Sequence, residues 1–114
     1  MPRIRITSGD VEMTAELNDT PTAEKLLAAL PFESPARLWG NEVYFDTPVE
    51  DVERDAQAVV PSGTIAFWPP GGCFCIFFGQ TPASPVNVLG TLDGDPQDFV
   101  QVQSGEPVRV EAAE

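Results

Sequence analysis

The chain has 114 residues, of which 42% are hydrophobic, and this predicts one folded domain over residues 1–114 with a single core. It carries 18 acidic and 6 basic residues, a formal net charge of −12, and no histidine. The acidic excess argues against nucleic acid and membrane surfaces as partners, because both are bound through clustered lysine and arginine. The lack of histidine excludes a Ser-His-Asp triad, a Cys-His pair and a histidine-ligated metal.

The first third of the chain predicts a β-hairpin followed by a helix. Apolar and polar residues alternate over 3–7 and again over 11–17, and a Ser-Gly-Asp turn lies between the two runs. This pattern is typical of strands with one buried face. A clear α-helix is predicted at about 21–30: Thr20 suits its N-cap, Pro21 its first turn, and leucines follow at helical spacing until Pro31.

The rest of the chain predicts short strands joined by turns. Strand patterns at 37–39 and 42–45 flank Gly40-Asn41, a favourable two-residue hairpin turn. The segment 46–62 is irregular, with at most a short strand near 58–60. Further strands are predicted at 63–68, 73–78, 86–92 and 107–112, and a short helix at about 96–102.

Together these elements predict a mainly β fold. About eight short antiparallel strands tend to close into a small barrel, because closure removes exposed sheet edges. The clear helix is too short to be stable alone, so we expect it to cover one open end of the barrel. The strand at 73–78 is apolar on both faces, which leaves open a monomer or a homodimer in which a second copy covers one face.

Three segments carry a family resemblance that extends over most of the chain. They are Gly63-Thr-Ile-Ala-Phe-Trp-Pro-Pro-Gly-Gly-Cys-Phe-Cys-Ile-Phe-Phe-Gly-Gln-Thr-Pro-Ala-Ser84, Leu38-Trp-Gly-Asn-Glu-Val-Tyr-Phe45 and Asn87-Val-Leu-Gly90. They resemble a family of small prokaryotic proteins, archaeal or bacterial, with a cyclophilin-like fold. The resemblance implies a compact, closed cyclophilin-like β-barrel and no settled biochemical activity.

The second half of the chain is also similar to true cyclophilins, the peptidyl-prolyl isomerases, in the order of its elements. Gly72-Cys-Phe-Cys-Ile76 and Val86-Asn-Val-Leu-Gly90 stand where that family has a Ser-Gln-Phe-Phe-Ile strand and a His-Val-Val-Phe-Gly strand. The Phe-His-Arg segment that supplies the catalytic arginine has no match, and the pocket histidine is absent. No catalytic residue is therefore carried over, and whether the protein is an enzyme stays open.

Neither the cysteines nor the carboxylates predict a metal or cofactor site. Cys73 and Cys75 are too few for a four-cysteine zinc site. A soft-metal or redox pair is the alternative to two core cysteines in a reducing compartment, and their apolar neighbours favour the core cysteines. Glu42 and Asp46 flank Tyr44, where an acid/base or cation-binding role is an alternative to ordinary solvated carboxylates. We expect the solvated form, because exposed Asp and Glu are the norm. We expect no metal and no cofactor.

Aromatic residues at strand ends are the best candidates for a binding site. Trp39, Tyr44 and Trp68 lie beside turns, where a barrel has accessible rims, and their rings combine an apolar face with a polar group. Gln80 and Thr81 could add hydrogen bonds, and Arg37 could supply a cation from the same strand face as Trp39. The alternatives are that these rings fill the core and that Arg37 is an ordinary surface arginine paired with an acid.

Three functions fit these residues. The favoured one is a binding module that holds a small molecule or an extended peptide in an aromatic-lined pocket. The second is a prolyl isomerase with substituted catalytic residues, in which Arg37 would act on the twisting amide. The third is a structural protein that acts as a homo-oligomer.

The charge pattern also bears on the source and location of the protein. No stretch is long and apolar enough for a signal peptide or a membrane-spanning helix, so we expect a cytoplasmic protein. Lys25 is the single lysine among scattered acidic residues, a composition that resembles proteins of salt-loving microbes. The alternative is an ordinary acidic protein.

The halophilic interpretation predicts a salt dependence. Like charges at the surface repel one another in dilute buffer and are screened by salt. The midpoint of urea unfolding should therefore rise clearly from low salt to molar sodium chloride. A midpoint that does not change with salt would show that the acidic surface is not an adaptation of this kind.

Overall fold

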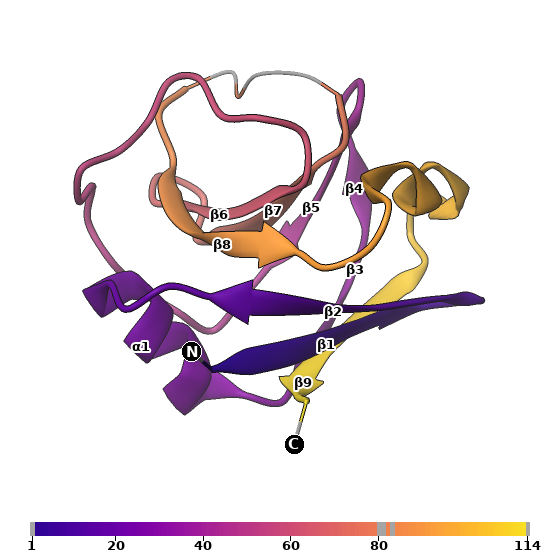
Figure 1. Cartoon of the computed structure of the whole chain (residues 1–114), viewed down its shortest axis with the longest axis horizontal. Coiled ribbons are helices and arrows are strands. Elements are labelled where there is room, and N and C mark those ends of the chain that lie inside the picture. Colours follow the sequence, from indigo (N-terminus) through magenta and orange to yellow (C-terminus); the bar gives the residue numbers. More distant parts are fainter. Residues whose placement is uncertain (1, 80–81, 83, 114) are drawn as a thin grey trace.

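In the computed structural model, which describes residues 2–79, 82 and 84–113, one antiparallel sheet curls into a nearly closed barrel (Figure 1). The strand order is β3-β9-β1-β2-β8-β6-β7-β5-β4. β3, at one end of this order, contacts β5, the strand next to the other end, and the rings of Phe32 and Phe45 lie 6.3 Å apart there. The elements are β1 (Arg3–Ser8), β2 (Val11–Leu17), α1 (Pro21–Ala29), β3 (Phe32–Pro35), β4 (Arg37–Leu38), β5 (Glu42–Asp46), β6 (Thr64–Trp68), β7 (Cys73–Phe77), β8 (Asn87–Leu92), the 3-10 helix η1 (Pro96–Gln101) and β9 (Pro107–Ala112).

This architecture confirms the predicted fold class and most of its elements. The helix α1 is capped by the Thr20 side chain, and the short helix η1 by that of Asp95. The described residues contain nine strands where about eight were predicted. The strand missing from the prediction is β3, which has polar residues and ends at Pro35; proline is tolerated there because β3 pairs with β9 on one side only. Among the described residues, no helix has the length and apolar character needed to cross a membrane.

The interior of the barrel holds the main hydrophobic core. The predicted hairpin of β1 and β2 contributes one alternating face, and α1 and η1 add Leu26 and Phe99. The phenylalanines of β5 and β7, Phe45 and Phe74, stack with ring centroids 5.1 Å apart inside this core. Strands β2 and β8 come so close that a Cβ on Gly90 would lie 1.9 Å from a backbone oxygen of Glu16, so this position requires glycine.

A second hydrophobic cluster covers the outer face of the same sheet. It consists of Val60, Ala66, Cys73, Cys75, Phe77 and Val86, with Tyr44, Trp68 and Val88 partly buried beside it. All five residues of β7 are therefore buried, some in the barrel interior and some in this outer cluster. A second copy of the chain is not needed to cover β7, because the chain's own residues do so.

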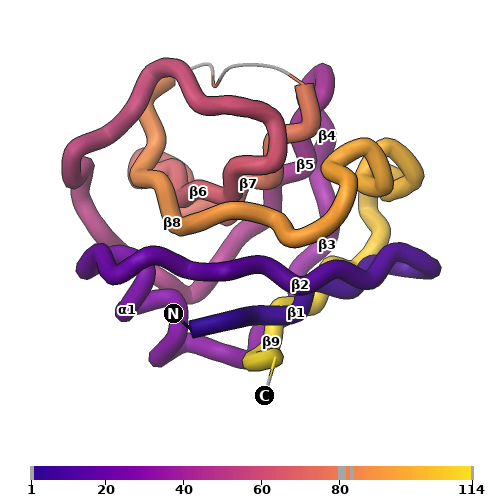
Figure 2. The backbone as a smooth tube through the Cα atoms, viewed as in Figure 1, coloured from indigo at the N-terminus to yellow at the C-terminus, as the bar shows by residue number. Residues whose placement is uncertain are grey.

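The outer cluster is covered by the long connection 47–63, which runs round the outside of the sheet (Figure 2). The predicted strand near 58–60 is wrong: Gln57 forms an isolated bridge with Val86, and the residues after it are not in a strand. This bridge and the buried side chain of Val60 hold the connection against the sheet. The connection therefore forms an outer wall of the molecule.

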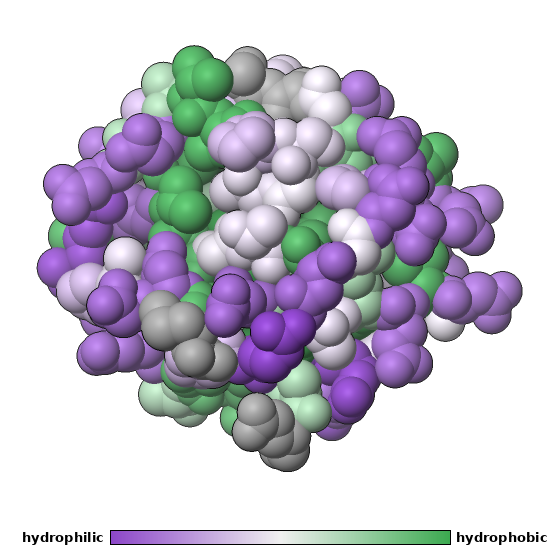
Figure 3. Space-filling view, viewed as in Figure 1, coloured by the Kyte–Doolittle hydropathy of each residue, from purple (hydrophilic) through white to green (hydrophobic). Residues whose placement is uncertain are grey.

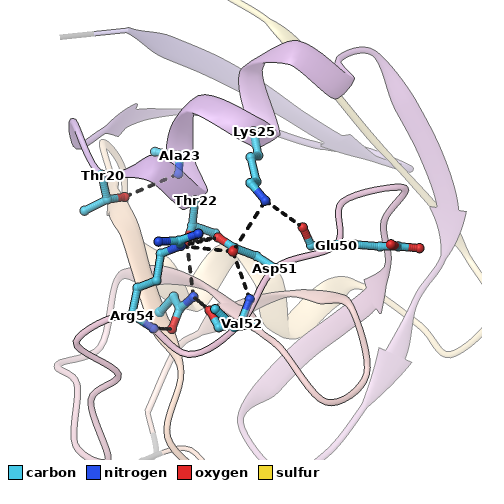
Figure 4. Close-up of polar contacts among 9 residues, drawn as sticks. Thr20, Thr22, Ala23, Lys25, Glu50, Asp51, Val52 and Arg54 are labelled. Carbon is cyan, nitrogen blue, oxygen red and sulfur yellow. Dashed lines mark hydrogen bonds and ion pairs between the residues drawn. The ribbon is translucent and has the colours of Figure 1, made fainter.

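Asp51 attaches this connection to helix α1 (Figure 4). Its side chain is 1% exposed and accepts hydrogen bonds from the Thr22 hydroxyl at 2.7 Å, the Val52 N–H at 2.8 Å and the Arg54 Nε at 2.9 Å. The Lys25 ammonium adds an ion pair at 3.5 Å from the same helix. A buried carboxylate with this many donors is fully compensated for its loss of water.

These contacts set the ionisation of Asp51. Burial alone would raise the pKa of this carboxyl, but the hydrogen bonds from Arg54, Thr22 and Val52 outweigh burial and hold the pKa well below its usual range. A carboxyl whose pKa is lowered by folding stabilises the folded state above its unfolded pKa, near 3.8, and this contribution is lost as the pH falls. The ionised side chain is thus the form that secures the connection.

We therefore predict that Asp51→Asn lowers the free energy of unfolding at pH 7 by about 2 to 4 kcal/mol, because hydrogen bonds to a charged group are lost in a buried place. The difference between variant and wild type should shrink as the pH falls below about 4. Urea unfolding at several pH values measures both effects. Glu53→Gln, in the same connection but exposed, is the matched control; a cost equal to that of the control would show that Asp51 does not hold the connection.

Candidate functional site

One cavity of about 200 Å³ opens on the outer face of the sheet. Its walls come from the hairpin of β4 and β5, from β6 and β7, and from the residues that precede β8. The described lining residues are Trp39, Glu42, Tyr44, Trp68, Cys75, Pro82, Ser84 and Val86. Two tryptophans and one tyrosine thus surround a small space that has one carboxylate.

Strand geometry brings the residues of the cavity floor together. Side chains two residues apart share a face of a strand, so Glu42 and Tyr44 of β5 both point to the outer side. Tyr44 lies directly opposite Cys75 in the pairing of β5 with β7. On the other side of β7, Cys75 is paired with Ala66, whose side chain is short. The floor is therefore a continuation of the outer hydrophobic cluster.

Trp68 ends β6 and forms one wall. Its indole N–H donates a hydrogen bond to the hydroxyl of Ser84, which fixes the ring from the segment before β8. The ring lies directly over Gly71, where an added Cβ would come within 2.5 Å of the ring carbons. The Pro-Pro-Gly-Gly turn after β6 thus provides a glycine where the indole needs space.

Trp39 lies at the mouth of the cavity. It precedes the two-residue turn of the predicted hairpin, and its backbone N–H donates to the carbonyl of Glu42 at 3.1 Å. The side chain is 48% exposed although it lines the cavity. A large ring that is half accessible to water at the edge of a concave site is available for contact with a ligand.

Glu42 is the charged group of the cavity, and its position differs from the solvated carboxylate that we expected. The residue is only 7% exposed, because the strand pattern of β5 turns it toward the outer hydrophobic cluster. Burial raises the pKa of this carboxyl, and a hydrogen bond from the Cys75 thiol opposes the rise. No ion pair within the described part of the chain includes Glu42. Asp46, the other carboxylate that flanks Tyr44 on this strand face, is exposed as predicted.

The two cysteines are free thiols and both are buried. Burial raises the pKa of Cys73 to about 11 and that of Cys75 well above its ordinary value, so both stay protonated at neutral pH. A protonated thiol is a weak nucleophile and a weak metal ligand. Across the described residues, no cluster of three or more metal-binding side chains occurs.

Arg37 lies beside the cavity and does not line it. Its guanidinium lies over the Tyr44 ring, 5.0 Å from the ring centroid, and forms an ion pair with Asp46. It also comes within 3.5 Å of the Cys73 sulfur. Arg37 therefore packs on the face of the Tyr44 ring, in keeping with a salt-bridged surface arginine.

Of the six predicted site residues, the structure brings Trp39, Tyr44 and Trp68 to one cavity. Gln80 and Thr81 lie outside the described residues. The predicted site did not include Cys75, which is paired with Tyr44 between β5 and β7, or Glu42, which lies on the same strand face as Tyr44 but was expected to be solvated. It also missed the contributions of Pro82, Ser84 and Val86, which depend on how a loop folds back.

The comparisons with known proteins agree with this architecture. A family model described as Cyclophilin-like matches residues 2–111. This chain belongs to the Cyclophilin-like family. No curated protein sequence matches the chain.

The solved structures that resemble this cyclophilin-like protein include the following two. The solution structure of the hypothetical protein AF2241 from Archaeoglobus fulgidus is 38% identical, with a TM-score of 0.83 over 98% of this chain and 95% of that one. The structure of McbB in complex with tryptophan is 17% identical, with a TM-score of 0.69 over 96% of this chain and 44% of that one. The second likeness shows the fold alone.

The burial of Glu42 should make the free energy of unfolding of this cyclophilin-like protein depend on pH. A carboxyl whose folded pKa is raised above its ordinary 4.5 contributes stability that is fully present below that pH and is lost as the pH rises through the folded pKa. Glu42→Gln keeps a neutral side chain of the same shape, so it should raise the free energy of unfolding at pH 7.

Urea unfolding between pH 4 and pH 8 measures this effect. The variant and the wild type should converge at the acidic end of this range and separate above it. Glu16→Gln, an exposed change of the same kind on β2, is the control and should not produce this pattern. Lower stability of Glu42→Gln at pH 7 would mean that the ionised carboxylate is favoured by its surroundings.

Proposed function

We propose that this cyclophilin-like protein is a binding module that holds a small ligand with an apolar body in the cavity on the outer face of the sheet. One observation carries the proposal: Trp39 and Tyr44 of the β4–β5 hairpin and Trp68 of β6 surround the same concave space, although the long connection 47–63 separates the two segments in the chain. Sites for small molecules are typically concave, rich in aromatic side chains, and supplied with few polar groups.

The size of the cavity limits the ligand. An apolar protein cavity of roughly 150 Å³ holds a benzene ring, and this cavity has about 200 Å³. One ring or one compact branched group fits, whereas most drug-sized ligands need roughly 300 Å³ or more. The half-exposed ring of Trp39 leaves the mouth open, so a longer molecule could place one such group inside and extend outward.

The prolyl isomerase alternative receives less support from the site. It required a donor aimed at the amide that twists, and Arg37 was the residue proposed for it. The guanidinium is instead paired with Asp46 beside Tyr44, and Arg37 is not among the lining residues. A proline ring still fits the cavity by size, so a proline peptide belongs among the probes.

We predict that Trp39→Ala abolishes ligand binding and leaves the protein folded, because a side chain that is 48% exposed contributes little to the core. The measurement follows the two indole N–H signals by NMR against single-ring and alkylammonium fragments and a short Ala-Pro peptide. Leu38→Ala is the matched control, since Leu38 is its neighbour, is 43% exposed and does not line the cavity; this variant should bind like the wild type.

If none of these probes shifts either indole signal of the folded wild-type protein, the proposal is wrong. Binding that survives unchanged in Trp39→Ala would place the ligand elsewhere on the molecule. Exchange spectra of the Ala-Pro peptide test the alternative at the same time, because uncatalysed cis/trans exchange takes tens of seconds or longer. Faster exchange in the presence of the protein would establish an isomerase.

A further inference from the structure

We propose that the ligand of this cavity is a small organic cation, a fully alkylated ammonium group held between the three aromatic rings with the Glu42 carboxylate as its counter-ion. The inference rests on the proposed function, since it names the class of ligand for the same site. It is drawn from the charge, the lining and the size of the cavity.

The first support is the position of Glu42. A buried carboxylate is costly unless cations or several hydrogen bonds compensate it, as they do for Asp51. Within the described residues, the Glu42 carboxylate has one hydrogen bond, from a thiol, which is a weak donor, and no ion pair. A cation in the cavity would supply the compensation that the chain itself does not.

The second support is the set of rings. The faces of tryptophan and tyrosine attract cations, and aromatic cages that bind quaternary ammonium groups use this attraction. The protein shows the same interaction beside the site, where Arg37 lies over Tyr44. The charge of Arg37 is paired with Asp46, so a ligand cation would not meet an unbalanced positive charge there.

The third support separates an alkylated ammonium from other cations. A calcium or magnesium ion needs about six oxygen ligands, and Glu42 is the one carboxylate among the described lining residues. A primary ammonium brings three N–H donors that each need an acceptor, whereas most of the described lining is aromatic or apolar. A trimethylammonium group needs no acceptor, and its size is close to that of the ring that a cavity of roughly 150 Å³ accepts.

The charge of the whole chain favours this ligand. A net charge of −12 concentrates cations around the protein and repels anions. Hydrophilic side chains occupy both sides of the visible face of the molecule, with hydrophobic ones exposed between them (Figure 3). A cation is thus attracted at long range and then meets an apolar, aromatic site.

The test compares choline with 3,3-dimethylbutan-1-ol, its neutral isostere in which carbon replaces nitrogen. Both are titrated at constant ionic strength while the indole N–H signals of Trp39 and Trp68 are followed by NMR. We expect choline to bind roughly tenfold tighter than the alcohol, because only the cation gains from the rings and the carboxylate. Glu42→Gln should remove most of this preference, measured as the ratio of the two affinities.

Glu16→Gln, which removes a charge from the surface, is the matched control and should keep the preference for choline. Equal affinity for the two probes in the wild-type protein would overturn the cation inference and leave the binding cavity standing. A preference that survives Glu42→Gln would overturn the role of Glu42 as counter-ion. No indole shift with either probe would overturn the inference, and the wider fragment set then decides whether the cavity binds anything.

Discussion

The buried carboxylate of Asp51 is the interaction on which the outer half of this protein depends. The connection 47–63 contains no named strand or helix, so it cannot hold its place through a hydrogen-bonded ladder. The connection is held instead by three hydrogen bonds to the Asp51 carboxylate, two from residues of the connection and one from α1. Asn87 extends the cluster by donating to the Thr22 hydroxyl and the Val52 carbonyl, so that helix, connection and β8 are joined at one point.

The second hydrophobic cluster exists because of this attachment. A sheet curled into a barrel buries its inner face without further help, but an outer face that carries apolar side chains needs a cover. Here the attached connection brings Val60 against β7, and the bridge of Gln57 with Val86 continues the cover toward β8. The cavity lies beside this covered area, where the segment before β8 reaches Trp68 through Ser84. The polar contacts of Asp51 therefore hold in place the outer cluster beside which the apolar cavity lies.

The sequence predicted what depends on local patterns and missed what depends on long-range folding. The alternation of apolar and polar residues predicted the β1–β2 hairpin. The N-cap and the leucine spacing predicted α1 to within one residue of its observed end. The position of the aromatic residues at strand ends indicated three of the residues that line the cavity. Glu42 was misjudged because exposure is the rule for acids, and only the outer cover turns its strand face into a buried one. Asp51 carried no signal, since the partners that fix it to α1, Thr22 and Lys25, lie far earlier in the chain.

The division of the hydrophobic residues into an inner and an outer cluster has an evolutionary consequence. The inner cluster closes the barrel, whereas the cavity is lined by the outer cluster and by loops. Substitutions at the cavity can therefore accumulate without disturbing the interior that holds the fold together. Lineages of this family could exchange one ligand for another by changing a few side chains on the outer face while inheriting the same barrel.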